Sequence, residues 1–226
     1  MKVIAFIPYW GDYALNTEHA IERNTINIAG KSLINMTVDT INKVECIQDV
    51  VVYASDDSIL SSFDLGAKCG FIARKKYLDS NKTTIEEIIR NFLLDSDADI
   101  VVLIHPKSPF LKHDTIQDCV DKVVSLNYDS AFTVNSIKKL AWFKGESINY
   151  SLRKNIPVSV DIEPILIETS SVYVFTRDVF ENTGSRIGEK PYMKEIGTFE
   201  GLEINTKEDF QMAELIVNSG FDRERG

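Results

Sequence analysis

Short runs of aliphatic residues recur along this chain, and segments with helical spacing separate them. The clearest run is Ile100 to Ile104 (IVVLI), and Lys2 to Pro8 (KVIAFIP) is of the same kind. Strands that are apolar at nearly every position are typical of a parallel sheet whose two faces are both covered. Because helical segments alternate with these runs, we expect an α/β fold with a doubly wound, mainly parallel sheet and right-handed crossovers.

The remaining elements follow the same alternation. Further strands are expected at Val50–Ala54, Phe71–Ala73, Asp129–Val134 and Ser171–Phe175, and helices at Lys31–Val44, Thr83–Asp95, Asp114–Leu126 and about Arg177–Glu181. The second of these helices is expected to open with a capping box formed by Thr83 and Glu86. In sheets of this kind ligands bind beyond the carboxyl ends of the strands, where polar loops follow the apolar runs of this chain.

The alternation stops between about residues 135 and 169. This part is polar, but it carries Trp142, Phe143 and Tyr150 together with two prolines. We predict an arm inserted before the last core strands of a single domain that spans residues 1–226. Exposed aromatic residues in such an arm suit an interface with a second subunit. A surface flap with a small core of its own is the alternative.

Composition and missing motifs exclude several classes of function. The net charge of −9 disfavours nucleic acid and anionic membranes as partners. Three distant cysteines indicate reduced thiols in a cytoplasmic protein, and the first apolar run is too short for a signal peptide or a membrane span. The sequence has no Gly-x-Gly-x-x-Gly, P-loop, Cys-x-x-Cys, His-Glu-x-x-His or Gly-x-Ser-x-Gly motif. These absences disfavour a classical dinucleotide enzyme, a zinc hydrolase and a serine hydrolase.

A pair of oxygen-bearing side chains stands near the end of the chain. Leu202 and Ile204 predict a short strand, and Glu203 and Asn205 alternate with them. On a strand, residues two apart point the same way, so the two polar side chains can converge on one ligand. Carboxylate and amide oxygens suit a hard cation such as Mg²⁺. The alternative is a polar edge strand followed by a helix that is capped by Thr206 and ended by Gly220.

Five segments in order resemble the acylneuraminate cytidylyltransferase family, which activates sugar acids as CMP-sugars. The segments are Arg23-Asn24 with Ile26–Ile34, Val51–Asp57 (VVYASDD), Leu103–Pro109 (LIHPKSP), Ser171–Phe175 (SVYVF) and Glu203–Phe210 (EINTKEDF). The resemblance covers nearly the whole chain. It implies a sheet of the nucleotide-diphospho-sugar transferase type.

The resemblance also implies a reaction, a cofactor and a set of site residues. A sugar acid hydroxyl would attack the α-phosphate of CTP, with pyrophosphate as leaving group, in a homodimer whose arm reaches the partner's site. The implied residues are Arg23 and Glu203 for catalysis, Asn24, Arg74 and Thr84 for the nucleotide, His105 for the sugar acid, and Glu203 and Asn205 for Mg²⁺. Four of these residues also have a structural alternative. Asn24 can be a turn residue and Arg74 a surface arginine, while Thr84 can cap a helix and His105 can be a structural histidine.

Two segments depart from the family pattern and keep other functions open. The loop from Tyr9 to Glu22 is acidic and nearly free of glycine, where the family has a basic, glycine-rich loop for the triphosphate. Pro157 to Val160 (PVSV) stands where relatives often show Pro-Arg-x-Gln. The second hypothesis is therefore a nucleotide- or sugar-binding regulatory protein without turnover. The third is a nucleotide-sugar-dependent glycosyltransferase, which the missing Asp-x-Asp between His105 and His113 disfavours.

Overall fold

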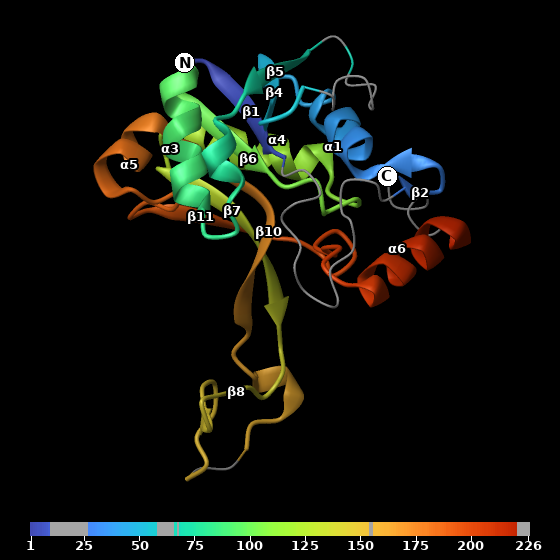
Figure 1. Cartoon of the computed structure of the whole chain (residues 1–226). Coiled ribbons are helices and arrows are strands. Elements are labelled where there is room, and N and C mark those ends of the chain that lie inside the picture. The colour runs from blue at the N-terminus through green and yellow to red at the C-terminus, as the bar shows by residue number, and fades with distance from the viewer. Residues whose placement is uncertain (10–26, 58–65, 67, 154–155, 221–226) are drawn as a thin grey trace.

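A seven-stranded sheet forms the centre of the molecule (Figure 1), with strand order β11-β7-β10-β6-β1-β4-β5. The computed structural model describes residues 1–9, 27–57, 66, 68–153 and 156–220. The sheet strands are β1 (Val3–Pro8), β4 (Asp49–Ala54), β5 (Cys69–Ala73), β6 (Ile100–Ile104), β7 (Ser130–Ile137), β10 (Ile165–Thr176) and β11 (Pro191–Glu195). Strand β10 runs antiparallel to β6 and β7, and the other neighbouring pairs of this sheet are parallel. The mainly parallel sheet predicted from the alternation is confirmed.

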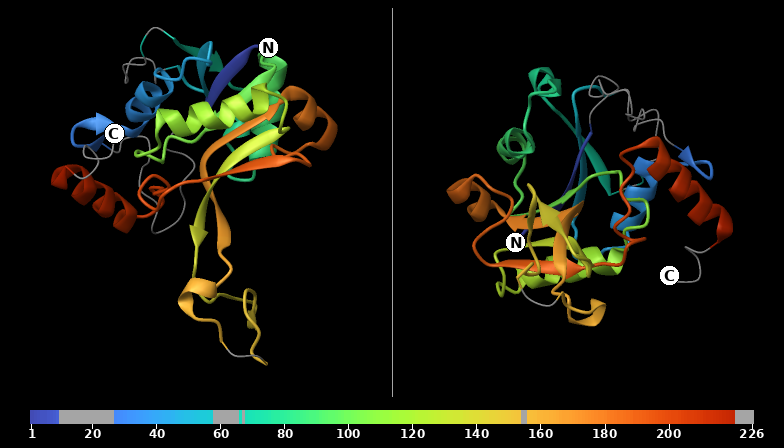
Figure 2. Two further views of the ribbon diagram at one scale, coloured as in Figure 1. Left: turned by 180° about the vertical axis from the view of Figure 1, so that it is seen from behind. Right: turned by 90° about the horizontal axis from the view of Figure 1, so that it is seen from below.

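Helices cover both faces of the sheet (Figures 1 and 2). The helices α1 (Leu33–Ile41) and α4 (His113–Val124) pack on one face, and α3 (Ile85–Asp95) and α5 (Arg177–Thr183) pack on the other. In α4 the buried positions recur at intervals of three and four residues, as an amphipathic helix requires: Thr115, Ile116, Cys119, Val120 and Val123. Because both faces are covered, every residue of β1 and β6 is buried.

A third, smaller cluster lies beside the main sheet. The strands β2 (Asn27–Ile28) and β3 (Lys31–Ser32) form a hairpin that turns through Ala29 and Gly30. The φ angles of these two residues are positive, 51° and 82°, and glycine at residue 30 adopts such an angle readily. Ile28 packs with Ala213 of the last helix, α6 (Lys207–Ser219). Short 3-10 helices span Lys76–Asp79 and Ser159–Asp161. In the described part of the chain, the helices are too short or too polar to cross a membrane.

The caps of two helices were expected from the sequence. The cap of α6 is confirmed: Thr206 and Asp209 form a capping box, and Gly220 ends the helix with a φ of 71°. The capping box of α3 is formed by Thr84 and Glu87, so the prediction of Thr83 and Glu86 was wrong by one residue. Residues 83 and 84 are both threonine, and each is followed three positions later by a glutamate. The local sequence pattern therefore fits either threonine as the cap.

Two predictions near the end of the chain were wrong. Leu202 to Asn205 do not form a strand, because they are not hydrogen-bonded into the sheet. The backbone N–H of Ile204 donates instead to the carbonyl oxygen of Lys107 at 2.8 Å. The sheet gains β11 instead, which was not predicted and which pairs with β7. This edge strand begins with Pro191 and carries charged residues, a composition that sequence patterns do not read as a strand.

The arm is a continuation of β7 and β10 beyond the body of the molecule (Figure 1). Its far part holds a hairpin of β8 (Trp142–Phe143) and β9 (Glu146–Ser147). The side chain of Asn149 links its own segment to two others. It accepts a hydrogen bond from Ala141 N and donates to the carbonyls of Lys139 and Glu163. The predicted excursion is confirmed, and the single-domain division stays a prediction.

Candidate active site

Two loops meet beyond the carboxyl end of β6. The loop after β6 begins at His105, and the loop before α6 contains Glu203. Backbone pairing of Ile204 with Lys107 holds the two loops together. The hydroxyl of Ser108 donates to that of Ser171 at 2.9 Å, and both serines are buried, so the first loop is also fixed to β10.

The loop that carries Glu203 is anchored at both of its ends. Glu200 accepts a hydrogen bond from Thr115 Oγ1 at 2.5 Å and one from Lys112 N at 3.2 Å, which places a carboxylate at the amino end of α4. On the other side, Thr206 and Asp209 cap α6, and Asp209 also accepts from Asn205 N at 3.0 Å. Glu203 therefore lies in a short segment between two helix termini.

Glu203 forms a largely buried ion pair with Lys107. Lys107 Nζ lies 2.7 Å from Glu203 Oε2, and each side chain is only 16% exposed. Ser170 N donates to Oε1, and Asn205 Nδ2 donates to Oε2 at 3.3 Å. Burial alone would raise the pKa of Glu203, but the hydrogen bond and charge of Lys107, with the Ser170 and Asn205 donors, outweigh burial and hold that pKa below its usual value. The carboxylate is therefore ionised at neutral pH.

Glu203 and Asn205 lie side by side, although the strand expected to place them does not form, and their convergence on one ligand stays a prediction. Asn205 presents its amide nitrogen, and both oxygens of Glu203 already accept from nitrogen donors. Among the described residues there is no group of three histidine, cysteine or carboxylate side chains suited to hold a metal ion. Mg²⁺ requires near-octahedral coordination by oxygen, so this donor set does not fit a resident Mg²⁺. The assignment of Mg²⁺ to Glu203 and Asn205 stays a prediction.

Arg74 follows β5 and is buried, so the reading of a surface arginine is wrong. Its side chain is 0% exposed, and Nη2 lies 2.5 Å from Asp79 Oδ1. Asp79 also accepts from Ser55 Oγ at 2.5 Å, which links Arg74 to the end of β4. A contact between Arg74 and a nucleotide stays a prediction.

The other predicted site residues fall in different places. The Thr84 hydroxyl accepts a hydrogen bond from Glu87 N at 3.2 Å, so the alternative of a helix cap is confirmed for this hydroxyl. A contact between Thr84 and a nucleotide stays a prediction. His105 directly follows β6, and its carbonyl oxygen accepts from Lys107 N at 2.7 Å; its contact with a sugar acid stays a prediction. Arg23 and Asn24 lie outside the described residues, as does most of the acidic first loop.

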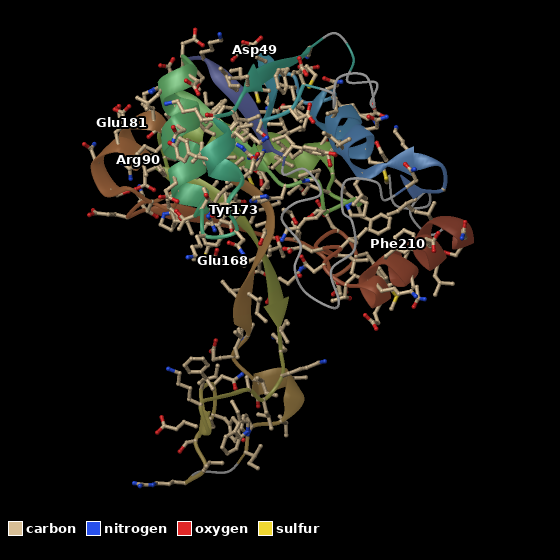
Figure 3. The ribbon with its side chains drawn as sticks, in the orientation of Figure 1. Asp49, Arg90, Glu168, Tyr173, Glu181 and Phe210 are labelled. Carbon is tan, nitrogen blue, oxygen red and sulfur yellow. The ribbon has the colours of Figure 1, made fainter. Side chains whose placement is uncertain are left out.

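Two polar groups were not assigned from the sequence. Lys107 was noted only as part of the LIHPKSP segment, although it stands in the loop after a central strand, where sheets of this kind bind their ligands. The second group lies where the arm leaves the body (Figure 3): the Tyr173 hydroxyl donates to Glu168 at 2.9 Å, and the Arg186 guanidinium lies 4.2 Å from the centre of the Tyr173 ring. That group depends on a register shift between Glu168 and Tyr173.

The relationship of the chain to known proteins agrees with this architecture. The model of a family described as cytidylyltransferase matches residues 20–214. The chain belongs to the cytidylyltransferase family. The resemblance stated from five segments is thereby confirmed at the level of the family, and Lys107 and Glu203 both lie within the matched range.

Two curated proteins align with the chain. It is 23% identical over 229 residues to the CMP-N,N'-diacetyllegionaminic acid synthase of Legionella pneumophila subsp. pneumophila, covering 96% of this chain and 97% of that protein. It is 27% identical over 169 residues to the 3-deoxy-manno-octulosonate cytidylyltransferase of Chlamydia caviae, covering 69% of this chain and 65% of that protein.

A solved structure shares the fold. The structure of CMP:2-keto-3-deoxy-manno-octonic acid synthetase complexed with CTP superposes with a TM-score of 0.70 at 13% identity, over 97% of this chain and 99% of that one. At this level of identity the likeness concerns the fold alone. It agrees with the expected sheet of the nucleotide-diphospho-sugar transferase type.

Proposed function

We propose that this protein transfers the cytidylyl group of CTP to a sugar acid. The acceptor's hydroxyl oxygen would form a bond to the α-phosphorus, and the bond from that phosphorus to the oxygen bridging the β-phosphate would break. The hydroxyl proton passes to solvent, and the products are a CMP-sugar acid and pyrophosphate. Such a transfer depends mainly on alignment and on neutralising phosphate charge.

The observation that carries the proposal is the Lys107–Glu203 pair beyond the carboxyl end of β6. It lies at the edge where parallel α/β sheets bind their ligands, in a chain that aligns over 96% of its length with a synthase of a CMP-sugar acid. Lys107 offers an ammonium group to phosphate oxygens. Through Ser170, Glu203 is fixed to the start of the core part of β10.

Roles for the remaining predicted residues follow from this proposal. Arg23 and Asn24 would contact the nucleotide, Arg74 and Thr84 would support its site, and His105 would contact the sugar acid. Mg²⁺ would arrive with the triphosphate as part of the substrate. Because CTP is an intracellular nucleotide, the proposed location is the cytoplasm.

The arm supports a homodimer as the working form. Its exposed apolar side chains include Trp142, Phe143, Leu152 and Val160, each more than half exposed in the single chain. Apolar surface of this kind, gathered on one projecting element, is typical of a protein interface. We propose that a second copy of the chain covers it.

Pyrophosphate release tests the proposed reaction directly. Protein is incubated with CTP, UTP, ATP or GTP, each with Mg²⁺ and with a panel of 2-keto sugar acids. We expect release selective for CTP and dependent on one acceptor. Binding of CTP without release from any acceptor would support the regulatory hypothesis instead, and transfer from a nucleotide-sugar donor would support the glycosyltransferase hypothesis.

A pair of histidine variants tests the acceptor site. His105→Ala is expected to raise the KM for the sugar acid while the KM for CTP stays within about twofold. His113→Ala is the control, because His113 lies on α4, is partly exposed and contacts Asp114 at 3.1 Å. Equal effects of the two variants would remove His105 from the acceptor site.

A further inference from the structure

The Lys107–Glu203 pair occupies the position at which the sequence predicted a metal ion. Lys107 is held on both sides of its backbone, since its N–H donates to His105 O at 2.7 Å and its carbonyl accepts from Ile204 N at 2.8 Å. The next residue, Ser108, is buried against Ser171. The ammonium group is therefore a fixed part of the site, and its 2.7 Å contact with Glu203 is that of a charge-assisted hydrogen bond.

We propose that Lys107 is the resident cation of this site and takes the place of a protein-bound divalent metal ion. One of its three N–H donors is directed at Glu203, which leaves donors for the phosphate oxygens of a nucleotide. This inference rests on the proposed function for the identity of the nucleotide. The protein then binds the triphosphate through Lys107 whether or not a divalent ion accompanies it.

The charges around Glu203 argue against metal binding by the protein itself. Among the described residues, the Glu203 carboxylate is balanced by the Lys107 ammonium, and the third member, Asn205, is neutral and donates its N–H. A divalent ion would have to displace Lys107 and turn the Asn205 amide, and the part of the chain that the structure describes would then offer it Glu203 as its one charged ligand. Removing the charge of Lys107 should favour metal binding, because it leaves the ionised carboxylate of Glu203 without a cation.

Manganese binding to nucleotide-free protein tests the inference without any substrate. Electron paramagnetic resonance measures free Mn²⁺ in the presence of the wild type, Glu203→Gln, Lys107→Met and the double variant. We expect the wild type and Glu203→Gln to bind Mn²⁺ equally weakly. Lys107→Met should bind it about tenfold more tightly, and the double variant should lose that gain. A wild type whose Mn²⁺ affinity falls about tenfold in Glu203→Gln would overturn the proposal.

Calorimetric titration with CTP in EDTA tests the phosphate contact. The wild type is expected to bind, Lys107→Arg to stay within about threefold, and Lys107→Met to weaken by about tenfold. Lys194→Met is the matched control, because Lys194 also lies 2.7 Å from a carboxylate, that of Asp118. Equal CTP affinity of Lys107→Met and the wild type in EDTA would contradict the proposal.

Two features of this design keep the outcomes separate. Circular dichroism and urea unfolding show whether each variant is folded, and the comparison of the wild type with Glu203→Gln needs no change at Lys107. Both measurements omit the acceptor, so failure to release pyrophosphate with any sugar acid would reject the proposed reaction and leave the assignment of Lys107 standing. Glu203-dependent Mn²⁺ binding would reject Lys107 as the resident cation and leave the reaction standing.

Discussion

At the scale of the residue, the site is defined by a carboxylate that is kept ionised although it is partly buried. Glu203 receives hydrogen bonds from Lys107, Ser170 and Asn205. Removing one partner of a buried ion pair costs more than the pair contributes, because the remaining charge stays desolvated. Because the pKa of Glu203 is lowered in the folded protein and protonation at low pH removes its charge, the pair gives the protein a pH-dependent stability.

Glu203→Gln should remove that pH dependence. Because the folded pKa of Glu203 is lowered from 4.5, its contribution to stability is complete above pH 4.5 and is lost as the pH falls through the lower, folded value. We expect the variant to be less stable by about 2 kcal/mol at pH 7, and the difference to shrink below pH 4.5. Urea unfolding between pH 7 and pH 3 measures it. A difference that stays constant over this range would contradict the assignment.

The three thiols are expected to react slowly in the folded protein. Burial raises the pKa of Cys119 to about 12 and that of Cys69 to about 11, and it also raises the pKa of Cys46. Since the thiolate is the reactive species, the thiolate fraction of Cys69 at pH 8 is roughly a hundredth of that of a thiol with a pKa of 9.0. Maleimide labelling at pH 8 should therefore be far faster in urea than in buffer. A native thiol that reacts at its urea rate would contradict this.

At the scale of the element, one arginine joins the end of α3 to the start of α5. Arg177 donates to the carbonyl oxygens of Leu93, Ser96 and Ala98 at 2.8–2.9 Å, and to Glu181 at 3.3 Å. The last carbonyls of a helix have no partner within that helix. The guanidinium supplies a donor to Leu93 in the last turn of α3 and also holds the carbonyls of Ser96 and Ala98 just beyond it, so one side chain ties the end of α3 to the start of α5.

Arg177→Met keeps the aliphatic stem and removes these donors. We expect a loss of about 3 kcal/mol, at roughly 1 kcal/mol for each carbonyl left without its partner. Arg90→Met is the control on the same face, where the guanidinium lies 5.7 Å from the ring centre of Phe180, and it should cost less than about 1 kcal/mol. Urea unfolding at pH 7 compares the two. Equal losses would show that the carbonyl contacts contribute little.

At the scale of the whole molecule, the body and the arm differ in how they are stabilised. The body buries two clusters, one on each face of the sheet. The arm exposes its aromatic residues, with Trp142 54% and Phe143 62% exposed and Trp142 packed edge-on against Tyr150. The arm therefore has little buried apolar surface of its own in the single chain, and a second chain would supply it.

Replacement of Trp142 and Phe143 by serine should weaken self-association without unfolding the body. Sedimentation velocity over a range of concentrations is expected to show a dimer for the wild type and a dissociation constant raised by about tenfold or more for the double variant. Leu94→Ser is the control, because Leu94 is 76% exposed on α3 and outside the arm. A wild type that is monomeric at every concentration would reject the homodimer.

The sequence by itself determined the central strands of the sheet, the main helices and the arm, because these follow from local periodicity and from apolar runs such as that of β6. It also determined the cap of α6 and the family. Tertiary structure decided the edge strand β11, the burial of Arg74 and the partners of Glu203. Lys107 and Glu203 lie 96 positions apart in the sequence, and their pairing depends on two loops that the sheet brings together. Such contacts between distant residues leave no periodic pattern in the sequence, so only the folded chain could show that Lys107 pairs with Glu203.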